Sequence, residues 1–231
     1  MKPKYLSKIN KFYNLIKFDK HRSFRLKLNS LLNDKKNSNY DYGEGFLYQS
    51  IPRLDIRGLR DTKKRIDILE LNKLFLNRDV LDIGTNIGSI VISSENNFKS
   101  CVGIDHNKDC INLANQIKNY LDLKLIEFIN EDFMKKKFNK KFDLILSLAN
   151  HSTFDCGIEN TKLYFERIYS LLQTNGYLIV ESHSPLYESN EIFLKYFDDL
   201  KSNYKVIRSG KYNFGNYYDR GRLFFVLRKK Y

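Results

Sequence analysis

The chain of 231 residues lacks a long apolar segment. No window approaches the run of about eighteen uncharged apolar residues that a membrane-spanning helix needs, so the sequence predicts no transmembrane span. Lys8, Lys11 and Lys17 interrupt the apolar residues near the N-terminus, where a secretory signal peptide would need an unbroken apolar core. We therefore expect no secretory signal and a cytoplasmic protein.

Cysteine is also scarce, with Cys101, Cys110 and Cys156 as the three examples. They form neither the close spacing of a metal-binding cluster nor the even set of a disulfide framework. We expect reduced, structural thiols. No cluster of metal ligands is evident in the sequence, so we predict no metal site.

Acidic residues are few at the N-terminal end, where residues 1–40 hold eleven Lys and Arg against two Asp. This part carries a charge of +9 of the total +13. Its lysines either solvate a surface or bind RNA, an anionic membrane or a phosphorylated substrate, and the sequence leaves these readings open.

Apolar residues in this basic part recur at helical spacing and predict two amphipathic helices. The residues are Tyr5, Ile9, Phe12 and Ile16 in the first helix and Phe24, Leu28, Leu31 and Leu32 in the second. A polar loop with two glycines follows at residues 37–45. We predict a helical extension over residues 1–45, as a possible lid, and a main domain over residues 46–231.

Short apolar runs alternate with helical patterns in the main domain, which indicates an α/β fold with a largely parallel sheet. The predicted strands lie at residues 80–82, 100–104, 125–129, 142–148, 177–180, 204–208 and 223–227. No helical pattern separates the last two, so they should form an antiparallel pair at one edge. We expect seven strands, with helices on both faces.

Polar residues follow five successive apolar runs. They are Asp82, Asp105, Asp132, Asn150 and the pair Glu181 and His183. Ligands of such sheets bind at the carboxyl ends of the strands, so one crevice should collect these side chains.

The loop after the first run, VLDIGTNIGSIV, lacks the glycines of a dinucleotide-binding site. The pattern G-x-G-x-x-G counted from Gly84 requires glycine at positions 86 and 89, where Asn86 and Ser89 stand. The loop instead follows D-x-G-x-x-x-G, ending at Gly88.

This loop resembles the first motif of the class I S-adenosylmethionine-dependent methyltransferases. Further segments resemble later motifs of that family in order: VGIDHN, EDF, FDLILSLANHS and LLQTNGYLIVESH. The resemblance covers residues 60–230 approximately. It implies a Rossmann-like sheet, S-adenosylmethionine as cofactor and S-adenosylhomocysteine as product.

The resemblance also implies roles in donor binding. Asp105 would accept both ribose hydroxyls, because a carboxylate can take two donors at once. Asn86 replaces a glycine that is frequent in the family, and asparagine tolerates the left-handed backbone of such a turn. The full set of predicted donor-binding residues is Asp82, Gly84, Asn86, Gly88, Asp105, His106, Asp132, Phe133 and Ser147.

An acceptor that carries a proton needs a base, and histidine has a suitable pKa. His151 follows the fourth strand, where the family contacts its acceptor, and His183 follows the fifth. Together with Asn150 they are the predicted catalytic residues. The alternative is that both histidines are structural.

The fourth strand is followed by ANHS and not by the D/N-P-P-Y/F of enzymes that methylate amino groups of bases and glutamines. Arginines before the first strand and near the last one could bind a small anionic acceptor, such as a sugar or phosphorylated intermediate. The alternative for those before the first strand is a solvated face with ion pairs to Asp55, Asp61 and Asp67. The predicted substrate-binding residues are Tyr48, Arg53, Arg57, Arg60, Arg220 and Arg222, with Arg65 close in sequence.

Two segments, YQSIPRLDIRGLRDTKKR and YYDRGRLFFVLRK, also resemble a subgroup of bacterial glycan and small-molecule methyltransferases. This narrower resemblance implies a role in surface-polysaccharide biosynthesis. Two alternatives stay open. One is an RNA methyltransferase that uses the basic N-terminal helices, and the other is a non-catalytic module that binds the donor.

Overall fold

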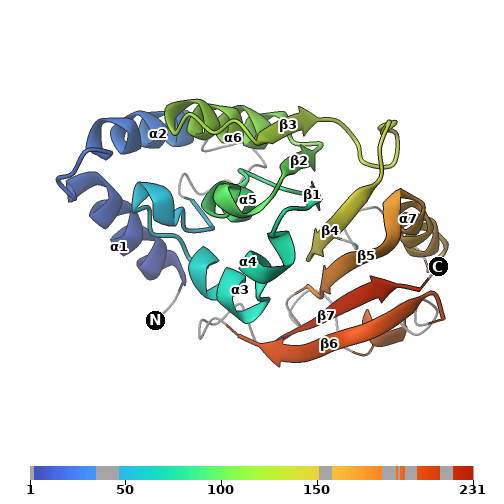
Figure 1. Ribbon diagram of the computed structural model, residues 1–231. Helices are drawn as coiled ribbons and strands as arrows, with labels where there is room; N and C mark the ends of the chain where they lie inside the picture. Colours follow the sequence, from blue (N-terminus) through green and yellow to red (C-terminus); the bar gives the residue numbers. More distant parts are fainter. Residues whose placement is uncertain are drawn as a thin grey trace.

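The centre of the molecule is a seven-stranded sheet (Figure 1), seen in a computed structural model that describes residues 3–34, 47–150, 158–183, 191, 193–195, 202–213 and 221–230. The strands lie in the order β3-β2-β1-β4-β5-β7-β6. Their bounds are β1 Asp79–Ile83, β2 Ser100–Asp105, β3 Ile126–Asn130, β4 Phe142–Leu148, β5 Leu172–Glu181, β6 Tyr204–Tyr212 and β7 Arg222–Lys229.

Strands β1 to β5 run parallel to one another, whereas β7 is antiparallel to both β5 and β6. The predicted mostly parallel sheet with an antiparallel pair at one edge is therefore confirmed. The register sets Ile83 of β1 beside Ile104 of β2 and Ser147 of β4, so these strands end at the same level. The polar residues that follow them consequently meet at one edge of the sheet.

Helices cover both faces of this sheet (Figure 1), as the sequence predicts. Successive residues of β1 alternate between two hydrophobic clusters, with Val80 in one and Leu81 in the other. The first cluster includes residues of α3 Thr62–Ile68, α4 Leu71–Phe75, α5 Ser89–Ser93 and α6 Lys108–Tyr120. The second includes residues of α7 Ile158–Leu171.

Asn-Gly is a frequent turn sequence, but Asn175 and Gly176 lie inside β5 at a bulge, where Asn175 has a φ of 64°. Residues 191 and 193–195 are helical. No helix among the described residues is both long and apolar enough to cross a membrane.

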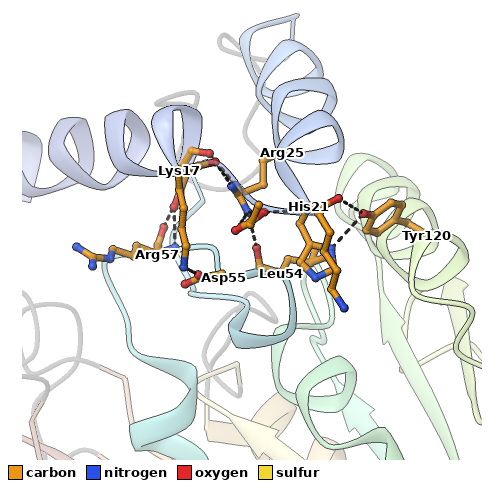
Figure 2. Close-up of polar contacts among 10 residues, drawn as sticks. Lys17, His21, Arg25, Leu54, Asp55, Arg57 and Tyr120 are labelled. Carbon is orange, nitrogen blue, oxygen red and sulfur yellow. Dashed lines mark hydrogen bonds and ion pairs between the residues drawn. The ribbon is translucent and has the colours of Figure 1, made fainter.

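Helix α2 Arg22–Asp34 packs on the first face beside α6, and α1 Pro3–Ile16 contacts α2 (Figure 1). Phe24 of α2 stacks on Tyr120 of α6, with 3.9 Å between the ring centroids. Arg25 is buried and donates to the Leu54 carbonyl at 3.1 Å (Figure 2). Helix α2 is therefore attached to later parts of the chain by both apolar and polar contacts.

The predicted boundary between the extension and the main domain lies at residues 45 and 46, outside the described residues. The division into these two parts stays a prediction, and so does the proposed lid role.

Candidate donor and acceptor site

The loop between β1 and α5 turns through three residues with positive φ: Gly84 at 66°, Asn86 at 55° and Gly88 at 72°. Asn86 thus adopts the left-handed backbone expected of it, and its side-chain oxygen accepts from the Ile87 N–H at 2.8 Å. A Cβ on Gly84 would lie 2.7 Å from Nδ2 of Asn150, so only glycine fits there. The missing side chain lets the loop and the segment after β4 approach each other.

Asp105 ends β2 and is held by two backbone donors. Its Oδ2 accepts from the Asn86 N–H and its Oδ1 from the Asn107 N–H, both at 2.9 Å. Each carboxylate oxygen has capacity for a further donor. The carboxylate is therefore fixed in orientation and still able to accept hydroxyl groups.

Asp132 and Phe133 follow β3. Oδ1 of Asp132 accepts from the Met134 N–H at 2.8 Å, which fixes the turn, and Phe133 is buried with its ring 5.5 Å from that of Tyr164. This turn supplies a carboxylate beside an apolar wall. That combination suits an adenine ring with an exocyclic amine.

Asn150 closes the middle of the site after β4. Its Nδ2 donates to the Ile83 carbonyl, and its Oδ1 accepts from Ser147 Oγ at 2.8 Å and from Tyr164 Oη at 3.1 Å. Both ends of the amide are therefore engaged in joining β1, β4 and α7. The sequence did not predict Tyr164 as a site residue, because it belongs to none of the motifs.

These side chains line one cavity of about 540 Å³ at the carboxyl ends of the strands. Small-molecule sites typically enclose about 300–1,000 Å³. Eleven predicted site residues line it: Tyr48, Arg60, Gly84, Asn86, Asp105, His106, Asp132, Phe133, Asn150, His183 and Arg222. Lining residues that the sequence analysis did not single out include Gln49, Asn107, Cys110, Glu131 and Ala149.

A buried charge cluster lies at the end of β5, and two of its members, Arg65 and Arg222, line the cavity. Glu181, which is fully buried at the end of β5, accepts from Arg65 Nε at 2.8 Å, from Arg222 Nη1 at 2.8 Å and from Tyr212 Oη at 2.5 Å. Nη2 of Arg65 also lies 2.8 Å from Glu181 Oε2, without the alignment of a hydrogen bond. Burial and then the charge of Glu181 raise the pKa of Tyr212 well above its usual value, so this phenol keeps its proton.

Arg60 adds a third guanidinium to this wall. It is buried, its guanidinium carbon lies 4.6 Å from the centre of the Tyr48 ring, and both residues line the cavity. Backbone hydrogen bonds from Arg60 to Tyr48 and from Ser50 to Arg60, each 2.8 Å, hold the two segments together. Arg60, Arg65 and Arg222 thus bring three guanidinium groups to the cavity lining, and Glu181 pairs with two of them, so the charge here is positive.

The cavity is therefore acidic at one end and basic at the other. Asp105, Glu131 and Asp132 lie after β2 and β3, whereas Arg65 of α3 and Arg222 of β7 lie against the end of β5. The sheet order places the ends of β1 and β4 between the acidic residues and the two arginines.

Several predicted residues do not line this cavity. Asp82, Gly88 and Ser147 are buried and are not among the lining residues. Gly88 packs against the Phe128 ring. Arg53 pairs with Glu95 at 3.4 Å, and the guanidinium of Arg57 lies 3.5 Å from the centre of the Tyr13 ring. His151 and Arg220 lie outside the described residues. The roles predicted for all these residues stay predictions.

Cys101 and Cys110 are both buried. Among the described residues, no group of three His, Cys, Asp or Glu side chains is arranged to hold a metal ion.

Asp82 gives a prediction about pH and stability. Burial raises the pKa of its carboxyl to about 6, although a hydrogen bond from Thr85 Oγ1 at 2.7 Å acts in the opposite direction. Between about pH 4 and pH 6 the folded protein keeps a proton that the unfolded chain has released, so stability falls as the pH rises through this window. Asp82→Asn cannot ionise and keeps an oxygen for Thr85. We expect its stability relative to the wild type to grow by about 2–3 kcal/mol from pH 4 to pH 7.

Urea unfolding of both proteins at a series of pH values measures this difference. A difference that does not change with pH would contradict the raised pKa of Asp82. The Thr85→Val variant serves as a control, because it removes the hydrogen bond while leaving the carboxyl able to ionise.

The sheet order, the glycine loop after β1 and the carboxylates after β2 and β3 together define a Rossmann-like site for S-adenosylmethionine. When bound, this cofactor supplies an electrophilic methyl group on a sulfonium ion. A model of the methyltransferase-domain family matches residues 76–217, and the chain belongs to this family of S-adenosylmethionine-dependent methyltransferases.

One curated relative is similar over most of the chain. It is the U6 snRNA methylphosphate capping enzyme Amus of Drosophila melanogaster, which is 29% identical over 215 residues that cover 84% of this chain and 69% of the relative.

Solved structures share the fold at lower identity. The N-methyltransferase NodS from Bradyrhizobium japonicum, in complex with S-adenosylhomocysteine, has a TM-score of 0.65 at 15% identity and covers 87% of this chain and 98% of its own. An rRNA methylase from Streptococcus thermophilus has a TM-score of 0.54 at 12% identity, covering 72% and 95%.

Proposed function

We propose that this methyltransferase acts on an anionic acceptor that carries a phosphate group. The observation that carries the proposal is the positive wall of Arg60, Arg65 and Arg222 in the same cavity as Asp105 and Asp132. Guanidinium groups bind phosphate oxygens through paired, charge-assisted hydrogen bonds. The acidic end suits the ribose and adenine of the donor, and the basic end suits the acceptor.

A phosphate oxygen needs little activation by the protein. In the dianion, the oxygen attacks the methyl carbon in line with the carbon–sulfur bond, an O–C bond forms, and the electron pair of the broken bond stays on sulfur. No proton leaves the acceptor, so His183 would bind and orient the phosphate and need not act as a base. A sugar hydroxyl would need a base, and His183 or His151 is the candidate in that case.

The phosphate has two candidate carriers. A small phosphorylated sugar or intermediate, as in surface-polysaccharide biosynthesis, accords with the mixed polar lining and the volume of the cavity. An RNA phosphate is supported by the name of the Drosophila relative, a methylphosphate capping enzyme of U6 snRNA. In the RNA version, the basic helices α1 and α2 would bind the rest of the nucleic acid.

Methyl labelling separates these carriers. Donor carrying a labelled methyl group is incubated with the protein and either small metabolites or RNA, each with and without prior phosphatase treatment. We expect the labelled methyl group to be incorporated into one of the two fractions. Incorporation should be lost when that fraction has first been treated with phosphatase. Label that survives the phosphatase would contradict a phosphate acceptor, and donor binding without label in either fraction would favour a non-catalytic module.

Arg60→Gln tests the positive wall directly. Loss of a charge-assisted hydrogen bond should raise the acceptor KM by about 10- to 150-fold, the equivalent of about 1.5–3 kcal/mol. The donor Kd should change less than about twofold, because the acids that suit the donor lie at the other end of the cavity. Arg57→Gln is the matched comparison, since its guanidinium lies over Tyr13 outside the cavity. An equal effect of the two substitutions would contradict the assignment.

A further inference from the structure

Helix α1 turns its apolar side to the solvent. The apolar residues at helical spacing are 61%, 49%, 63% and 55% exposed for Tyr5, Ile9, Phe12 and Ile16 respectively. Phe18, just beyond the helix, is 89% exposed. A surface helix normally buries its apolar stripe against the core, so this orientation requires a physical reason.

Hydrogen bonds on the opposite side of α1 fix the orientation. Asn10 Nδ2 donates to the Gly58 carbonyl at 2.9 Å, and Asn14 exchanges two hydrogen bonds with the Arg57 backbone, at 2.9 and 2.8 Å. Ser7 and Asn10 are buried in this contact. Rotating the helix to bury Phe12 would expose the apolar core beneath and break all three bonds.

The turn after α1 is fixed as well. Arg25 donates to the carbonyls of Asn14 at 2.8 Å and Lys17 at 2.5 Å, and Lys17 forms an ion pair with Asp55 (Figure 2). The apolar stripe is therefore held outward from the middle of the helix to its C-terminal end.

The charges of α1 indicate what this stripe meets. Helix α1, Pro3–Ile16, contains Lys4, Lys8 and Lys11 and no acidic residue. Lys8 is exposed and lies beside the stripe, three residues after Tyr5 and four before Phe12. An exposed apolar stripe with basic residues at its border is the pattern of a helix that lies in the interface of an anionic membrane.

We infer that the outward face of α1, defined by Tyr5, Ile9, Phe12, Ile16 and Phe18, binds the surface of an anionic lipid bilayer. A second copy of the chain is a poorer occupant, because lysines would face lysines with no acid to pair them. RNA is also poorer, because bases stack on planar rings and the stripe places aliphatic Ile9 and Ile16 between its aromatic residues. Lipid accepts aliphatic and aromatic side chains alike.

Vesicle binding tests this inference with the full chain. We compare sedimentation with vesicles of phosphatidylcholine alone and of phosphatidylcholine mixed with phosphatidylserine. Binding should require the anionic lipid. Ile9→Gln combined with Phe12→Gln should weaken it at least about tenfold, since each side chain loses its apolar burial. Lys8→Glu should weaken it at least about fivefold.

The matched control is Leu76→Gln combined with Leu163→Gln, which removes two exposed leucines far from α1 in the sequence. It should bind vesicles like the wild type, and all variants should keep wild-type donor affinity. Equal vesicle binding by the two double variants, or none by the wild type, would overturn the inference. The inference would also be overturned if the wild type did not bind vesicles and the Ile9 and Phe12 double variant lost RNA binding or self-association instead.

Discussion

Replacing Glu181 by glutamine should lower the free energy of unfolding by about 3–5 kcal/mol, the cost of removing one partner from a buried ion pair. Glu181 is fully buried, and the side chains of Arg65 and Arg222 are each 4% exposed. In the amide, the oxygen still accepts hydrogen bonds but the NH2 group cannot, and the two buried guanidinium groups are left without a counter-charge. Chemical denaturation of the variant and the wild type measures the difference.

Glu166→Gln is the matched control for this substitution. Glu166 lies 4.0 Å from Lys162 on the exposed side of α7, and pairs of this kind contribute about 0.3–0.5 kcal/mol. If the two glutamine variants lost similar stability, the cluster at Glu181 would not be the buried ion network that its geometry indicates.

The Glu181 cluster also has a consequence for function. Its hydrogen bonds tie together α3, β5, β6 and β7, which approach one another from distant parts of the chain. The two arginines are thereby held in place at the cavity wall before any acceptor arrives. A guanidinium held in this way loses less side-chain freedom on binding an anion than one on a flexible surface chain.

The sheet could be predicted because each strand is an apolar run with a polar residue at its end. Asp82, Asp105 and Asn150 marked three of these ends, and parallel strands must place them at one edge. The motif resemblance then predicted which residues bind the donor. These signals are local in the chain, so a single sequence contains them.

The basic end was predicted less completely because its contacts join distant residues. The arginines at 65 and 222 were visible as charges, but Glu181 is 116 positions from Arg65, and Tyr212 stands in a stretch with no motif. Arg53 and Arg57 look the same as Arg60 in sequence, yet only Arg60 lines the cavity. Gly58 approaches the Gln49 backbone closely and Arg60 pairs with the Tyr48 backbone, and neither contact is visible in the spacing of the arginines.

The side of α1 that faces the solvent could not be predicted from the sequence either. The spacing of Tyr5, Ile9, Phe12 and Ile16 defines a stripe but not the side on which the main domain lies. The contacts of Asn10 and Asn14 with backbone more than forty residues away decide it. An amphipathic pattern alone therefore indicates a helix and leaves its orientation to tertiary contacts.

Asp105→Ala should weaken donor binding by about 10- to 150-fold, the equivalent of about 1.5–3 kcal/mol for hydrogen bonds to a charged group. The carboxylate is predicted to accept the ribose hydroxyls, and it is held in orientation by the Asn86 and Asn107 N–H groups. Isothermal calorimetry with S-adenosylhomocysteine measures the affinity without turnover. Asp67→Ala, at an exposed position of α3, should leave it unchanged.

Asp105→Asn separates the two roles of this carboxylate. The amide keeps one oxygen for the backbone donors but loses the charge and half of the accepting capacity, so its donor affinity should fall between that of the wild type and that of Asp105→Ala. Thermal unfolding of both variants reports how far the loop itself depends on Asp105. If Asp105→Ala lost stability but bound S-adenosylhomocysteine as tightly as the wild type, the ribose assignment would be wrong, and the carboxylate would serve only to join the Asn86 and Asn107 loops.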